Sequence, residues 1–150
     1  MEDSRCIENL IYCYAERIDS GDLEGVAELF RHAEIFSPAH NVRRTGYDEV
    51  LQMYQLSCRL YEKTGTPLTK HLTTNVIIEL NDDGTTASAR SYYTVIQATD
   101  ALPLQPIISG RYRDQFHKVG GQWQFRSREM LVDLIGDCSA HLLYDSSGLA

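Results

Sequence analysis

The sequence predicts an α+β fold in which N-terminal helices pack on a curved antiparallel sheet. Apolar residues recur at helical spacing between residues 4 and 18, whereas long segments rich in β-branched and tyrosine residues follow residue 69. Because the helices precede the strands and do not alternate with them, α+β is favoured over α/β. A long sheet wrapped over helices would enclose a cavity, which is a natural site for a small molecule.

The first predicted helix carries a carboxylate at its end. Apolar positions within residues 4–18 form one stripe, and Asp19 lies about 40° beyond Ala15 at the edge of that stripe. We therefore expect Asp19 to look into a pocket beside the core. A Ser-Gly pair ends this helix, and Asp22 is the expected N-cap of a second helix over residues 23–31.

Two hairpins follow the helical half of the chain. Short strands at residues 33–38 and 43–45 and a third helix at residues 47–62 are predicted before them. The turns at residues 81–84 and 120–121 contain glycine, which supplies the positive φ that hairpin turns need. The four hairpin strands are predicted at residues 69–80, 85–98, 107–119 and 122–134. Residues 139–150 are expected to form a loose tail.

One domain is expected over residues 1–150, with a core at about 4–134. Hydrophobic residues make up 43% of the chain and charged residues 23%, a composition typical of globular proteins. No apolar run approaches membrane-spanning length and no signal-peptide segment is present, so the cytoplasm is the expected location. The net charge of -7 and the pI near 5.1 disfavour nucleic-acid or anionic-membrane partners.

Asp19 and His71 are the candidate catalytic pair. A carboxylate can orient an imidazole and stabilise its charged form, which makes histidine a competent base near neutral pH. Aspartate is also common near turns for local hydrogen bonding, and a strand histidine is often structural. A helix C-terminus is nevertheless electrostatically poor for a carboxylate, so the position of Asp19 invites a partner such as His71.

Other kinds of chemistry find no support in the motifs. The five histidines show neither HxxxH nor HxH spacing, so no metal site is predicted. The sequence contains no GxGxxG, P-loop or GxSxG motif, so no nicotinamide or other cofactor is expected. The four cysteines form no CxxC pair and are expected to be buried free thiols.

Three stretches resemble the SnoaL-like group of the nuclear transport factor two-like superfamily. They are Ile7 to Phe30, His71 to Leu80 and Gly110 to Met130, and the group's closing hairpin resembles GRYRDQFHKVGGQW at residues 110–123. The resemblance implies a cone-shaped α+β barrel, commonly a homodimer, with a pocket between the sheet and the helices. We expect the dimer to form through the outer face of the sheet, whose strands look too apolar for a fully wet face.

The match is closest to the dehydrochlorinase and bile-acid dehydratase patterns of that group. It implies that Asp19 and His71 are the catalytic residues and that Tyr14, five residues before Asp19, contacts the substrate. Burial alone explains Tyr14 about equally well. Arg128 falls near a substrate-binding arginine of the group, although Arg126 lies on the same face of the predicted strand. The third helix and the loop between the hairpins match neither enzyme, which leaves the substrate open.

Two functions of different classes follow. The first is a cofactor-independent lyase or isomerase, such as a dehydratase, dehydrochlorinase or ketosteroid-isomerase-like enzyme, acting on a small apolar ring compound. His71 would abstract a proton from carbon, while Tyr14 and Arg128 would stabilise a leaving group or an oxyanion. The second is a non-catalytic ligand-binding or assembly module, such as the small subunit of a ring-hydroxylating dioxygenase. A hydrogen bond between Asp19 and His71 inside an accessible cavity would favour the enzyme.

Overall fold

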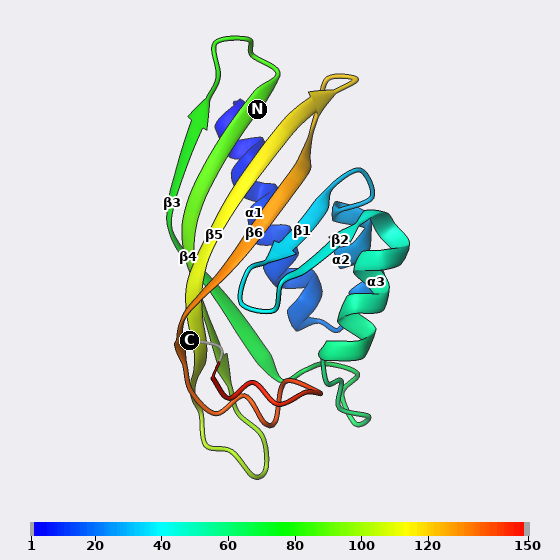
Figure 1. Cartoon of the computed structure of the whole chain (residues 1–150), viewed down its shortest axis with the longest axis vertical. Helices are drawn as coiled ribbons and strands as arrows, with labels where there is room; N and C mark the ends of the chain where they lie inside the picture. Colours follow the sequence, from blue (N-terminus) through cyan, green and yellow to red (C-terminus); the bar gives the residue numbers. More distant parts are fainter. Residues whose placement is uncertain (1, 149–150) are drawn as a thin grey trace.

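A computed structural model describes residues 2–148, in which three helices cover one face of a six-stranded sheet (Figure 1). The elements are α1 (Asp3–Asp19), α2 (Leu23–Leu29), β1 (Glu34–Ser37), β2 (Val42–Thr45), α3 (Gly46–Ser57), β3 (Thr69–Leu80), β4 (Thr86–Gln97), β5 (Gln105–Val119) and β6 (Gln122–Ile135). The predicted α+β fold is confirmed. The curved sheet is open, with β2 and β3 at its edges. It also contains one parallel pair, β1 with β6, which corrects the expectation of a wholly antiparallel sheet.

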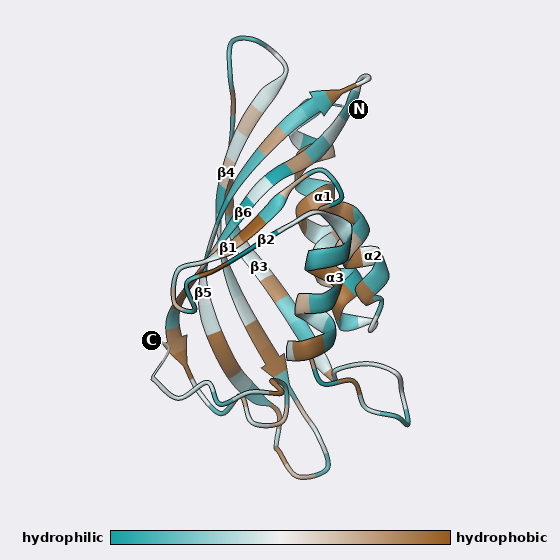
Figure 2. Ribbon diagram, turned by 45° about the vertical axis from the view of Figure 1, so that its right-hand side comes forward, coloured by the Kyte–Doolittle hydropathy of each residue, from teal (hydrophilic) through white to brown (hydrophobic). Residues whose placement is uncertain are grey.

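The apolar stripe of α1 anchors the helical layer to the sheet. Ile7, Ile11, Tyr14 and Ile18 are all buried, and α1 packs against β3 and β6. The helices lie together on one side of the sheet, while its other side is uncovered (Figure 2). No helix within residues 2–148 is both long enough and apolar enough to cross a membrane.

A β-bulge in β3 changes which side chains face the core. The pairing of β3 with β4 shifts its register between Thr74 and Ile77, and Asn75 has a φ of 56°. An extra residue reverses the alternation of side chains beyond it. Val76 and Ile78 consequently pack against the core, while Asn75 and Ile77 are exposed. The apolar run at residues 76–78 therefore contributes only one exposed residue to the outer face.

A second bulge lies in β6 and separates the two arginines that the sequence placed on one face. Phe125 pairs with Phe116 and Ser127 pairs with Gln115, so Arg126 is the extra residue of β6. Arg126 is exposed, whereas Arg128 is fully buried. The expectation that both side chains share one face is therefore wrong.

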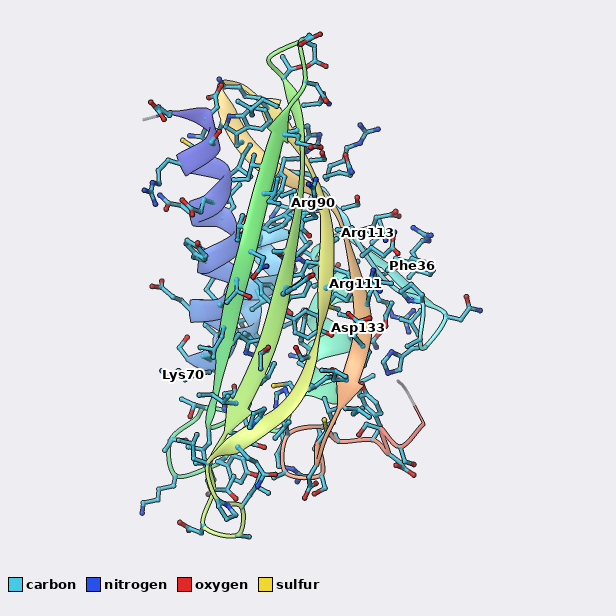
Figure 3. All side chains as sticks on the ribbon, turned by 90° about the vertical axis from the view of Figure 1, so that its left-hand side faces the viewer. Phe36, Lys70, Arg90, Arg111, Arg113 and Asp133 are labelled. Atoms are coloured by element: carbon cyan, nitrogen blue, oxygen red, sulfur yellow. The ribbon has the colours of Figure 1, made fainter. Side chains whose placement is uncertain are left out.

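The uncovered face of the sheet carries both charged and apolar side chains (Figure 3). Arg111 forms an ion pair with Asp133 at 2.8 Å on this face, and Tyr92 lies there with 52% of its surface exposed. Tyr93 and Val95 point into the core and are buried. The apolar residues that suggested a dimer through this face are thus largely internal, and the dimer remains a prediction.

The C-terminal segment is attached to α3, not loose. Cys58 pairs with Leu142 in an isolated bridge, the backbone N–H of Arg59 donates to the carbonyl of His141 at 2.8 Å, and Leu143 donates to Ser57 at 3.0 Å. These bonds take up backbone groups that a longer helix would use. Accordingly α3 ends earlier than predicted, and the expectation of a loose tail is wrong for residues 139–148. The four cysteines are free, as predicted, but only Cys58 and Cys138 are buried, whereas Cys6 and Cys13 are partly exposed.

Candidate active site

The turn after α1 fixes the position of Asp19, the last residue of that helix. The backbone N–H of Gly21 donates to the carbonyl of Ile18 at 3.0 Å, and that of Asp22 donates to Arg17 at 2.9 Å. Gly21 has a φ of 79°, and a Cβ there would lie 2.0 Å from the carbonyl oxygen of Gly65. Only glycine meets both demands.

The cap of α2 completes this turn. The side chain of Asp22 accepts a hydrogen bond from the backbone N–H of Gly25 at 2.8 Å, which confirms Asp22 as the N-cap. The start of α2 therefore holds the end of α1 in place, with Asp19 facing β3.

Asp19 and His71 form a hydrogen-bonded pair between α1 and β3. The ring Nδ1 of His71 lies 2.6 Å from Oδ1 of Asp19, which is a hydrogen-bond distance. The backbone N–H of His71 donates to Oδ2 at 2.7 Å, and the hydroxyl of Thr69 donates to Oδ1 at 2.8 Å. The two side chains are only 6% and 9% exposed. The carboxylate therefore has three donors arranged around it.

This arrangement selects one tautomer of His71. A carboxylate only accepts hydrogen bonds, so Nδ1 carries a proton and Nε2 keeps a free lone pair. Burial raises the pKa of the Asp19 carboxyl, but the hydrogen bonds and charge of His71 outweigh burial and hold that pKa below its ordinary value. Asp19 is consequently ionised at neutral pH and can stabilise an imidazolium.

His71 lies at the wall of a cavity of about 350 Å³ between α1, α3 and the sheet, and Asp19 contacts His71 without being among the described residues that line the cavity. His71, Tyr14 and Tyr54 line one part of it, and apolar side chains such as Ile18, Val95 and Met130 line much of the rest. Ligand cavities typically span about 300–1,000 Å³ and combine apolar walls with a few polar groups. This cavity suits a small, mainly apolar ligand.

Two tyrosine hydroxyls meet inside the cavity. The hydroxyl of Tyr14 lies 2.7 Å from that of Tyr54, and the Tyr14 ring stands edge-on to the ring of His71 at 6.2 Å between centroids. Burial raises the pKa of Tyr14, so its hydroxyl keeps its proton at neutral pH. One of the two hydroxyls donates to the other. When Tyr14 is the donor, the Tyr54 proton is free to be donated to a ligand; when Tyr54 is the donor, the Tyr14 hydroxyl lies 4.0 Å from Sδ of Met130, to which it can donate weakly.

Arg128 does not reach the cavity. Its guanidinium donates to both carboxylate oxygens of Asp114, each at 2.8 Å, and both side chains are fully buried. The guanidinium lies over the rings of Tyr112 at 3.7 Å and Tyr14 at 4.5 Å. Arg128 therefore stands behind two cavity residues, and the described residues that line the cavity do not include it.

Four residues around the site were not singled out from the sequence. Thr69 is two residues before His71, so the alternation of a strand was a usable signal for it. Helical periodicity places Tyr54 on the inward face of the third helix, but its hydroxyl contact with Tyr14 depends on how the helices pack. His40 and His141 line the cavity from loops, where no periodicity exists to reveal them.

No metal site is assigned. Within residues 2–148, no group of three or more His, Cys, Asp or Glu side chains is arranged to hold an ion. The cavity wall supplies an oriented imidazole, a tyrosine pair and apolar side chains.

Comparisons with known proteins agree with the fold. A candidate scytalone dehydratase from Novosphingobium aromaticivorans is similar over 90% of this chain and 87% of its own, with 29% identity and a TM-score of 0.70. A protein of unknown function from Mycobacterium tuberculosis (22% identity, TM-score 0.72, covering 98% and 81%) and a candidate aromatic ring hydroxylase from Novosphingobium aromaticivorans (19% identity, TM-score 0.70, covering 92% and 95%) share the fold. No curated protein matches the sequence. The family model described as a SnoaL-like domain matches residues 1–129, and the chain therefore belongs to the SnoaL-like family.

Proposed function

We propose that this protein is a cofactor-independent lyase or isomerase that removes a proton from carbon in a small, largely apolar ring compound. The observation that carries the proposal is the hydrogen bond of 2.6 Å from Asp19 to His71, whose ring lines an accessible cavity. A structural histidine at this place would need neither an ionised partner nor a cavity beside it.

In this proposal, Nε2 of His71 is the base. The C–H bond breaks, the proton forms a bond to Nε2, and the electron pair stays on the substrate. That pair either forms an enolate or expels a leaving group from the neighbouring carbon. Asp19 keeps Nδ1 protonated and stabilises the imidazolium, while the Tyr14–Tyr54 pair donates to the developing oxyanion. A positioned base supplies about 10²–10⁴-fold of rate enhancement.

Arg128 has a supporting place in this scheme. The centre of its guanidinium lies 4.5 Å from the centre of the Tyr14 ring, and Arg128 is not among the described residues that line the cavity. A cation over the ring face makes a phenol hydroxyl a better donor. We propose that Arg128 holds and polarises Tyr14, in place of the direct substrate contact expected from the sequence.

The alternative is a ligand-binding or assembly module without catalysis. A module of that kind needs an apolar cavity but no oriented base. The three hydrogen bonds around the Asp19 carboxylate favour the enzyme, because they fix a reactive tautomer that simple binding does not require.

Deuterium exchange into 2-tetralone tests the proposal without the natural substrate. This small bicyclic ketone has acidic carbon-bound protons, and their exchange in D₂O is followed by proton NMR. Wild-type protein should accelerate exchange, and His71→Ala should lose at least about 10²-fold of that acceleration. His32→Ala, an exposed histidine outside the cavity, is the matched control and should exchange like wild type. Equal rates for His71→Ala and wild type would favour the binding module.

A further inference from the structure

His141 belongs to a segment that closes the cavity from the C-terminal side. The backbone N–H of His141 donates to Cys138 at 3.0 Å, and its carbonyl accepts from Arg59 at 2.8 Å. The neighbouring carbonyl of Ala140 accepts from the hydroxyl of Tyr61 at 2.6 Å and from the side chain of Gln97 at 3.1 Å. The segment is therefore tied to both the sheet and the end of α3. It also lies outside the residues that the family model matches.

The ring of His141 is buried, and one of its two nitrogens has no partner in the described part of the chain. His141 is 6% exposed, and its Nδ1 is buried without a hydrogen-bond partner among residues 2–148. Buried polar groups normally have partners, because an unsatisfied one costs about 1–3 kcal/mol. The ring lines the same cavity as His71, and the two ring centroids lie 6.2 Å apart. A role in packing alone would be met better by an apolar side chain.

We infer that His141 is a ligand-positioning residue, whose neutral imidazole donates a hydrogen bond to an oxygen atom on the ring compound held against His71. The inference rests on the proposed function only for the identity of that compound. It narrows the substrate class to rings that carry a hydroxyl, ketone or phenol oxygen close to the carbon that loses its proton.

The protonation state of His141 fits a hydrogen-bond donor to the ligand and not a general acid. Burial, and then the charge of His71, lower the pKa of His141 to about 4 against the opposing effect of Asp19. His141 is therefore neutral at pH 7, with one N–H to donate and no proton that it can readily release. Of the nearby groups, Asp19 is occupied by His71 and Thr69, so it does not compete for the His141 proton.

Two probes of equal ring size test the inference. 2-Naphthol resembles the enol of 2-tetralone and carries the oxygen, whereas naphthalene lacks it. Wild-type protein should bind 2-naphthol more tightly than naphthalene. His141→Phe should weaken 2-naphthol binding about tenfold and leave naphthalene binding within about twofold. His141→Gln, which keeps an N–H donor, should restore part of the loss, and His32→Phe should behave like wild type.

A second measurement uses only the wild-type protein, so it does not depend on whether a variant folds. In ¹⁵N-histidine-labelled wild-type protein, the His141 ring signals should shift on adding 2-naphthol and stay in place on adding naphthalene. The inference would be overturned if that shift were absent, or if His141→Phe weakened the binding of 2-naphthol and of naphthalene equally. It would also be overturned if the wild-type protein bound 2-naphthol no more tightly than naphthalene. The proposed function can fail without the inference failing. In that case deuterium exchange into 2-tetralone would not depend on His71, whereas 2-naphthol binding would still depend on His141.

Discussion

Replacing Asp19 by asparagine should reverse the tautomer of His71. Asp19 accepts hydrogen bonds from the His71 backbone at 2.7 Å, from Nδ1 at 2.6 Å and from Thr69 at 2.8 Å. Asparagine offers one oxygen and one NH₂ group at this place. The backbone N–H can only donate and therefore takes the oxygen, so the NH₂ group faces Nδ1. Nδ1 must then accept, and the ring proton moves to Nε2.

The expected cost to stability is small compared with the cost to catalysis. The hydroxyl of Thr69 can rotate to accept from the NH₂ group, so all three hydrogen bonds survive in neutral form. Hydrogen bonds to charged groups contribute about 1.5–3 kcal/mol and neutral ones about 0.5–1.5, so weakening all three would cost about 3–4.5 kcal/mol in total. Relief from burying a charge offsets part of it, so we expect about 1–3 kcal/mol. Exchange of 2-tetralone should fall by at least about 10²-fold, because a protonated Nε2 cannot accept a proton.

Urea unfolding, the exchange rate and ¹⁵N shifts of His71 measure the three consequences. The shifts should move the protonated signal from Nδ1 in wild type to Nε2 in Asp19→Asn. Exchange within about threefold of wild type, with the tautomer reversed, would refute the role of Nε2 as the base. An unchanged tautomer would refute the hydrogen-bond argument itself.

The stability difference between wild type and Asp19→Asn should also depend on pH. Because the pKa of Asp19 is lower in the folded protein than its ordinary value of 3.8, the carboxylate stabilises the fold above that value. The advantage should hold at neutral pH, shrink below about pH 4, and vanish once the folded carboxylate is protonated.

Three further predictions concern the rest of the molecule. Arg128→Met should lower the free energy of unfolding by about 3–5 kcal/mol in urea, because Asp114 is left charged and buried, and adding Asp114→Leu should recover much of the loss. Burial, and then the charge of Asp19, raise the pKa of Cys58 to about 11. Cys58 should therefore react with a disulfide reagent at pH 8 more slowly than Cys6. We propose a homodimer through the outer face of the sheet. Light scattering should report twice the chain mass for wild type and a lower mass for Tyr92→Lys, and a wild-type monomer at micromolar concentration would contradict it.

Local patterns in the sequence determined the elements that depend on local forces. The periodicity of residues 4–18 predicted α1, and Asp22 as N-cap predicted the start of α2. The span of β3 is as predicted, and both hairpin turns lie where glycine allows a positive φ. Helical periodicity, capping and turns involve residues a few positions apart, so one sequence suffices to place them.

The candidate catalytic pair required more than periodicity. Taken alone, Asp19 and His71 had ordinary structural explanations, and the resemblance to a family joined two residues that are 52 positions apart. The hydrogen bond between them then follows from the turn after α1 and the packing of that helix on β3. Thr69, which completes the shell of the carboxylate, had only the weak signal of its place in the strand.

Tertiary contacts decided what the sequence patterns could not. The bulge at Arg126 exposes that residue and buries Arg128 against Asp114, because an extra strand residue changes the side that later side chains face. α3 ends at Ser57, because the next backbone groups pair with the C-terminal segment, and that pairing brings His141 over the cavity. These outcomes depend on which distant backbone groups form hydrogen bonds with one another. The sequence contains no periodic pattern that indicates such long-range pairing.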